Sequence, residues 1–127
     1  MGVEAWSLEP DESATRLQPG RDAPKAARWF VWVVAARETL PADMETATLL
    51  VTEAVSNAVR YGASDAPISL TCTVEGDSLR VVVRNTGPRF DLSDPSRSGD
   101  GLQLVAALSR GWGSRPTEDG MEVWFEV

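Results

Sequence analysis

One stretch, residues 49–62 (LLVTEAVSNAVRYG), constrains the fold of this 127-residue chain more than any other. It is the second half of a segment in which apolar residues recur at three- and four-residue steps, the period of an amphipathic helix. Pro41 and Asp43 are typical of a helix start, and Gly62 is typical of a helix end, at the C′ position. The sequence therefore predicts one long helix whose apolar face is Met44, Ala47, Leu50 or Val51, Ala54, Val55 and Ala58.

Two polar residues of this helix, Glu53 and Asn57, are four positions apart, so both lie on one side of it, beside the apolar stripe. A carboxylate and a carboxamide one turn apart are hard oxygen donors that suit a metal–phosphate ligand. For an isolated E-x-x-x-N pattern a solvated helix edge is the better explanation, because so short a pattern is common by chance. The meaning of the pair thus depends on the motifs that follow it in the chain.

Composition excludes several functional classes. The net charge of −7 argues against nucleic acid or an anionic membrane as the main partner, because both require a basic surface. The chain has no histidine and one cysteine, Cys72, which excludes Ser-His-Asp triads, phosphoaccepting histidines and the usual zinc sites. A single cysteine suits a reducing compartment, and we find neither a signal-peptide pattern nor a membrane-spanning apolar run. We therefore expect a cytoplasmic protein.

The first part of the chain predicts few regular elements. We expect a short edge strand at residues 3–8, a connection without periodicity at residues 9–23, and a helix from Pro24 to about Thr39. The apolar face of that helix is predicted to be Ala26, Trp29, Phe30, Val33 and Val34, with its tryptophans packed in the core.

The second part predicts two hairpins. Residues 67–74 alternate between apolar and polar, with Cys72 on the buried face, and pair with residues 79–85. Residues 112–116 and 120–127 form the other hairpin. Asn85 falls at the core-facing end of its strand, where its amide needs a partner, either the turn at residues 86–88 or a ligand. The order of elements predicts an α+β, two-layer sandwich in one domain: 1–21 as N-terminal strand and connection, 22–127 as core.

A turn-rich loop at residues 89–100 leads into Gly99-Asp100-Gly101, and a helix begins at once with Leu102. Glycines at a helix N-terminus let the backbone approach an anion, and the free N–H groups and helix dipole favour phosphate there. The pattern is neither a Walker loop nor a Rossmann turn.

Taken in order, these motifs resemble the GHKL superfamily of ATPases, which includes histidine-kinase ATPase domains. The matching features are the E-x-x-x-N helix, Asn85-Thr86-Gly87 at a strand end, the variable loop, the paired glycines and the closing EVWFEV strand. The likeness covers roughly residues 22–127 and is greatest to small actinobacterial proteins related to anti-sigma regulatory serine kinases. It implies a Bergerat-type fold, a mostly antiparallel sheet covered on one face by helices.

The resemblance implies that ATP and Mg²⁺ bind between the helices and one face of the sheet. Asn57 would coordinate Mg²⁺ through its carbonyl oxygen, and Glu53 would act as the general base. The adenine would lie at Asn85, with Gly87 allowing the backbone to approach the base. The variable loop at residues 89–100 would act as a lid. The remaining implied residues contact the phosphates: Gly99, Gly101 and the N–H of Leu102 along them, and Arg89 or Arg97 at the terminal phosphate.

Two departures from the family pattern fall in the base pocket. Asn85 stands where the family has an aspartate that accepts from the adenine amino group, so that bond loses its charge assistance. Met121-Glu122 follows the glycine of the last hairpin, where the family commonly has a threonine.

Three functional hypotheses follow. The first is an ATP-dependent protein serine/threonine kinase that phosphorylates a small anti-sigma-antagonist protein and sequesters a sigma factor. The second is a degenerate GHKL module that binds a regulatory protein, with weak, altered or no nucleotide binding; an acidic surface suits docking to a basic helix. The third is a domain that resembles the family by chance. The family often dimerises, and Trp124 on the wet sheet face suggests a covered surface, so a homodimer is possible.

Overall fold

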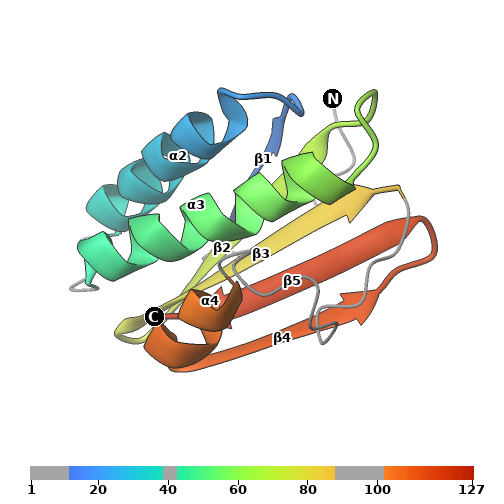
Figure 1. Ribbon diagram of the computed structural model, residues 1–127. Helices are drawn as coiled ribbons and strands as arrows, with labels where there is room; N and C mark the ends of the chain where they lie inside the picture. Colours follow the sequence, from blue (N-terminus) through green and yellow to red (C-terminus); the bar gives the residue numbers. More distant parts are fainter. Residues whose placement is uncertain (1–11, 39–42, 88–101) are drawn as a thin grey trace.

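The computed structural model describes residues 12–38, 43–87 and 102–127, which form a sheet with helices on one of its faces (Figure 1). The sheet has five strands in the order β1-β2-β3-β5-β4, and every neighbouring pair is antiparallel. The predicted α+β sandwich is therefore confirmed. The elements in chain order are β1 (Glu12–Leu17), α2 (Ala23–Arg37), α3 (Met44–Tyr61), β2 (Ile68–Glu75), β3 (Ser78–Thr86), α4 (Leu102–Leu108), β4 (Gly111–Pro116) and β5 (Gly120–Glu126).

The long helix α3 follows its sequence pattern closely. Asp43 caps it: the carboxylate accepts hydrogen bonds from the Thr46 backbone N–H at 3.2 Å and from the Thr46 hydroxyl at 2.7 Å. These two bonds lower the pKa of Asp43. The predicted apolar stripe is confirmed, because its members are buried except Met44, which packs partly buried against the core.

The two predicted hairpins, β2–β3 and β4–β5, are confirmed by the strand pairing. Cys72 pairs with Val81 between β2 and β3, and both side chains are fully buried beneath the helices. Burial raises the pKa of the Cys72 thiol to about 12, so this cysteine is an inert member of the core. Val81 in turn pairs with Phe125 of β5, which makes β3 the centre of the apolar face.

The predicted core face of α2 is wrong for Ala26, Trp29 and Val33, but it is right for Val34, which is buried, and for Phe30, which packs partly buried against the core. Trp29 is 72% exposed, and Ala26 and Val33 are also exposed, whereas the buried residues are Ala23, Ala27, Val31, Val34 and Ala35. The helix is apolar around nearly its whole circumference, so periodicity alone does not select the buried side. Small side chains face the core because α2 packs closely on α3 and the sheet.

The N-terminal prediction is also wrong in part. Strand β1 occupies Glu12–Leu17, inside the segment predicted to be an irregular connection, while the strand predicted at residues 3–8 lies outside the described residues. Only Leu17 of its described side chains is buried, so β1 shows no apolar alternation. Pairing with β2, from Glu12 opposite Thr73 to Leu17 opposite Ile68, holds it at the sheet edge. Within the described chain, no helix is long and apolar enough to span a bilayer.

Candidate functional site

The two polar residues predicted on α3 differ in how far they are exposed to solvent. Glu53 is partly exposed and makes no hydrogen bond or ion pair with another described residue, whereas Asn57, one turn later, is only 3% exposed. Neither Oδ1 nor Nδ2 of Asn57 has a hydrogen-bond partner among the described residues. Leaving a buried amide unpaired costs about 1–3 kcal/mol, so Asn57 is a group in need of a ligand.

The possible metal ligands near Asn57 suit a metal ion that is bound mainly by nucleotide phosphates better than one bound mainly by protein side chains. The described residues contain no group of three or more Cys, Asp or Glu side chains that could hold a metal ion by themselves. Mg²⁺ commonly takes one or two protein oxygens and completes its octahedron with water and phosphate oxygens. The Asn57 carbonyl oxygen is suited to be the one protein ligand of such an ion, with Glu53 a turn away to hold or accept a proton.

Asn85 occupies the buried end of β3, as predicted. It is 5% exposed, and its Nδ2 donates to the Thr86 carbonyl at 3.4 Å, longer than a good N–H···O bond. The turn thus satisfies this amide only weakly. Asn85 pairs with Met121 of β5, so the two residues that depart from the family pattern face each other across the central strands.

The strand end at Asn85 is closely packed through three glycines. A Cβ added to Gly120 would lie 1.9 Å from the Asn85 carbonyl oxygen, and one added to Gly87 would lie 2.5 Å from the Ala63 backbone nitrogen. Gly87 has φ +130°, and its N–H donates to the Asp119 carbonyl at 2.9 Å. Gly87 was predicted to let the backbone approach the nucleotide base, and that role stays a prediction; what the structure shows is that Gly87 contacts the residues at the end of α3, where a side chain would not fit.

Gly62 is also part of the contact between the end of β3 and the end of α3. It is the C-cap of α3 with an extended backbone (φ −86°, ψ 178°), not the C′ residue predicted from the sequence. A Cβ there would lie 2.8 Å from Asn85 Nδ2 and 2.5 Å from the Ala58 carbonyl oxygen. The absence of a side chain at Gly62 therefore places the helix end directly over the Asn85 amide.

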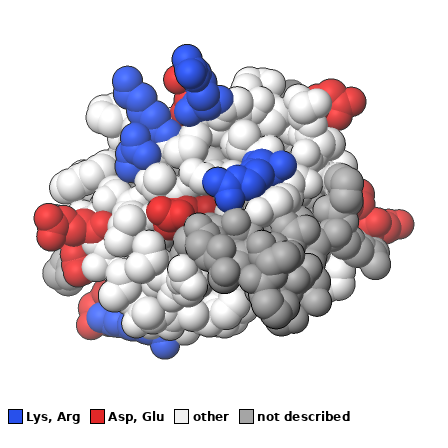
Figure 2. Space-filling model, in the orientation of Figure 1, with Lys and Arg blue, Asp and Glu red and all other residues white. Residues whose placement is uncertain are grey.

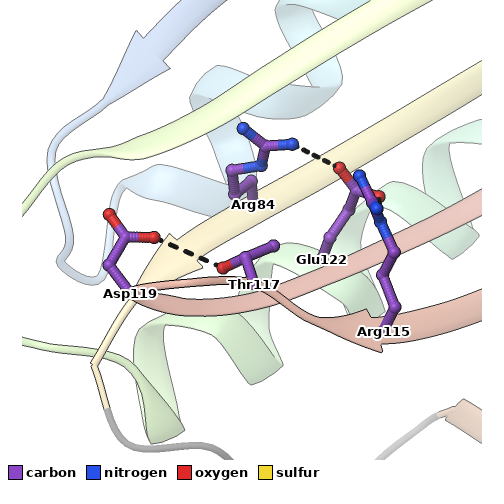
Figure 3. A network of polar contacts seen from close by, with 5 residues as sticks. All are labelled: Arg84, Arg115, Thr117, Asp119 and Glu122. Atoms are coloured by element: carbon purple, nitrogen blue, oxygen red, sulfur yellow. Dashed lines mark hydrogen bonds and ion pairs between the residues drawn. The ribbon is translucent and has the colours of Figure 1, made fainter.

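The opposite face of the sheet carries a polar network of a different kind (Figure 3). Arg84 of β3 and Arg115 of β4 point toward Glu122 of β5 from two sides, with N···O distances of 2.8 and 2.6 Å. These bonds, the one from Arg115 first, hold the pKa of Glu122 below its usual value. In the turn between β4 and β5, the Thr117 hydroxyl bonds to Asp119 at 3.3 Å. Both carboxylate oxygens of Glu122 accept hydrogen bonds within this network, so neither is a buried acceptor without a partner.

Several predicted site residues are not placed by the structure. Gly99, Gly101, Arg89, Arg97 and the predicted lid at residues 89–100 lie outside the described residues. Leu102 begins α4, which packs against α3. Sequence reasoning missed Ser109, whose buried hydroxyl also lacks a partner among the described residues. A serine just after a helix gives no signal of such burial.

These features define a class: a two-layer sandwich with an unpaired buried amide on the helix-covered side. The sequence profile of the histidine kinase-like ATPase domain matches residues 18–127. The chain belongs to the histidine kinase-like ATPase domain family, whose members bind ATP, usually with Mg²⁺. This confirms the GHKL resemblance at the level of the superfamily.

Solved structures agree on the fold. The catalytic domain of histidine kinase ThkA, in a nucleotide-free orthorhombic form, is 17% identical, with a TM-score of 0.60 over 91% of this chain and 95% of that one. A second nucleotide-free form of the same domain is 15% identical, with a TM-score of 0.58 over the same shares. A search of curated proteins gave no match.

Proposed function

We propose that this protein binds Mg-ATP at Asn57 and acts as a protein serine/threonine kinase of the anti-sigma regulatory type. The observation that carries the proposal is the buried Asn57 side chain, both of whose polar atoms lack a partner, in a chain of the ATPase family. A bound Mg²⁺ would supply charge stabilisation at the phosphates. The Asn57 carbonyl oxygen would hold it, and the neighbouring Gly62 and Ala63 would close the base end of the site.

Glu53 is proposed to orient a partner hydroxyl and take its proton. The chain has no histidine to act as base or phosphoacceptor. Glu53 is partly exposed and makes no bond to another described residue, so its carboxylate is open to an incoming substrate. The proposed phosphorylation substrate is a serine or threonine of an anti-sigma-antagonist protein, and a sigma factor is the proposed second partner.

The first test is thermal unfolding with and without millimolar Mg-ATP or Mg-GTP. A ligand at about 100 times its Kd adds about 2.7 kcal/mol, or about 10 °C in a domain of this size. The shift with ATP is expected to be lost in Asn57→Ala and kept in Ser56→Ala, a neighbour on another side of α3. A shift with GTP alone would mean that Asn85 selects a different base.

The kinase step has its own control. Glu53→Ala is expected to abolish phosphate transfer to the partner while keeping the ATP-induced shift. Glu45→Ala, an exposed glutamate in the first turn of the same helix, is expected to change neither. Transfer that persists in Glu53→Ala would remove Glu53 from the proposed mechanism.

A second candidate function is nucleotide-independent binding of a regulatory protein. The observation that favours it is the pairing of Asn85 with Met121, both buried, which replaces a charged acceptor and its polar neighbour by an amide and a thioether. Absence of any shift with either nucleotide, together with partner capture in nucleotide-free buffer, would favour this module over the kinase.

A further inference from the structure

Helix α2 exposes its largest side chains instead of burying them. Trp29 is 72% exposed and Trp32 51% exposed, more than any other large apolar side chain among the described residues. Val33, beside them, is 38% exposed. Burying such side chains would be worth about 1.5–3 kcal/mol each, yet the chain places alanines toward its own core. Adjacent exposed apolar side chains of this size mark an interaction surface.

The exposed residues form a regular seam. Ala26, Trp29, Val33 and Ala36 are all exposed and follow one another at steps of three, four and three residues. This is the spacing of the a and d positions of a coiled-coil heptad, which bring one helix side by side with another. Trp32 lies at the edge of the seam, and the small Ala26 and Ala36 at its ends permit close approach. We call this surface the α2 seam.

The charge of α2 is opposite to that of the chain. Lys25, Arg28 and Arg37 are its only charged residues, although the chain as a whole has 12 basic and 19 acidic residues. Lys25 and Arg37 take the positions that flank the seam in a heptad, and Arg28 bonds to the Thr52 hydroxyl on α3 at 3.1 Å. In Figure 2 basic side chains lie at the top, left of centre, with an acidic side chain beside them, over the N-terminal half of α2 in Figure 1.

We propose that the α2 seam docks an amphipathic helix of a partner protein that carries small and aliphatic residues on its apolar face and Asp or Glu at the flanking positions. The apolar contact would bury Trp29, Trp32 and Val33, and the acidic flanks would meet Lys25 and Arg37. A second copy is disfavoured, since two α2 helices would place like charges together. An anionic bilayer would be repelled by the acidic remainder of the chain.

This surface is separate from the proposed nucleotide site. Within the helix layer, α3 packs against both α2 and α4 (Figure 1). Asn57 is buried, whereas the α2 seam is exposed to solvent. The inference therefore does not rest on ATP binding, and its test contains no nucleotide.

The test uses the whole chain and a fluorescein-labelled helical peptide of about three heptads, with Ala and Leu alternating at a and d and Glu at e and g. Saturable binding by fluorescence anisotropy is expected, and a peptide with Lys in place of Glu is expected not to bind. Trp29→Ser and Val33→Ser should weaken binding about tenfold or more, typical of a truncated anchor residue. Leu104→Ser on α4, as exposed at 38% as Val33, should leave it unchanged.

Other outcomes would overturn the proposal. Absence of peptide binding, or equal binding by Trp29→Ser, removes the seam as a helix-docking site. A dimer in sedimentation equilibrium that dissociates in Trp29→Ser identifies a second copy as the occupant. Sedimentation of the protein with phosphatidylserine vesicles that is lost in Trp29→Ser identifies a membrane as the occupant of the α2 seam. Unchanged circular dichroism of Trp29→Ser and Val33→Ser excludes unfolding as the cause of any loss.

Discussion

The buried polar groups on the two faces of the sheet differ in whether they have hydrogen-bond partners. On the open face, the Glu122 side chain is only 11% exposed, but Arg84 and Arg115 bond both of its oxygens. On the helix-covered face, the amide of Asn57 is more deeply buried and has no described partner. A buried polar group therefore indicates function here only when its own surroundings leave it unsatisfied, whereas the satisfied network stabilises the fold.

The close packing at the end of β3 joins the sheet to the end of α3, and breaking it has the largest expected effect. Gly120→Ala would bring Cβ to 1.9 Å from the Asn85 carbonyl oxygen, a backbone clash that no side-chain rotation relieves. We expect a loss of more than about 4 kcal/mol in urea unfolding. Gly76→Ala is the control: its φ is +61° but it has open space, so about 1 kcal/mol is expected. Equal losses would contradict the packing argument.

The second-largest effect is expected for the network that Glu122 forms with Arg84 and Arg115. Glu122→Leu removes two charge-assisted hydrogen bonds and is expected to lower the free energy of unfolding by about 1.5–3 kcal/mol. Glu126→Leu is the matched control on the same strand and face. Among the described residues its carboxylate bonds only to Arg80, at 3.2 Å, and the Glu126 side chain is 31% exposed, so less than about 1 kcal/mol is expected. If both variants lose the same amount, the network has no special role.

The same network predicts a pH dependence. The pKa of Glu122 is lowered in the folded state, so the folded protein favours the ionised form. The resulting stabilisation is fully present above the pKa of an unfolded glutamate, about 4.3, and is lost as the pH falls through the lower folded value. Urea unfolding between about pH 6 and pH 2.5 should show this loss in the native chain and a shallower decline in Glu122→Gln. Parallel curves would disprove the assignment.

The unsatisfied amide should behave in the opposite way. Without nucleotide, Asn57→Leu is expected to keep or raise the free energy of unfolding, by up to about 1 kcal/mol, because it removes a buried group with no partner. Asn57→Val, which is smaller, controls for overpacking. Urea unfolding without ligand measures both. A loss of about 2 kcal/mol in each would show that Asn57 is satisfied in the folded chain.

The smallest effect is expected at the open face. The Arg80 guanidinium lies 4.4 Å from the centre of the Trp124 ring, and the arginine is 37% exposed. Arg80→Ala should cost about 0.5–1 kcal/mol in thermal unfolding. Arg16→Ala, an exposed arginine on β1, should cost nothing measurable. Identical melting temperatures for the two variants would show that the stacked pair contributes no stability.

The sequence predicted correctly those elements whose buried and exposed sides follow from the local order of apolar and polar residues. The α3 stripe, the alternating strands around Cys72 and Phe125, and the inward position of Asn85 all follow from local period and composition. These features were enough to give the fold class, whereas Glu53 and Asn57 gained a functional meaning only from the order of motifs that resembles the ATPase superfamily.

The remaining features depend on contacts between distant segments. Strand β1 forms because β2 offers it an edge, and its own sequence, ESATRL, carries no apolar alternation. Gly87 and Gly62 meet only when the ends of β3 and α3 come together. The α2 seam was misassigned because Trp29 and Val33 are residue types typical of a core, and no local rule states that a face of smaller alanines and valines is buried instead.

The strand order has a consequence for how the chain acquires its structure during synthesis. Strand β5, which follows β3 and β4 in the chain, lies between them, and Val127 exchanges two backbone hydrogen bonds, of 2.8 and 3.0 Å, with Leu79. While residues 120–127 are still in the ribosomal tunnel, the backbone N–H and C=O groups along one edge of β3 have no strand to pair with. Such an unpaired edge can associate with other chains, so the nascent sheet is exposed to aggregation until β5 has emerged.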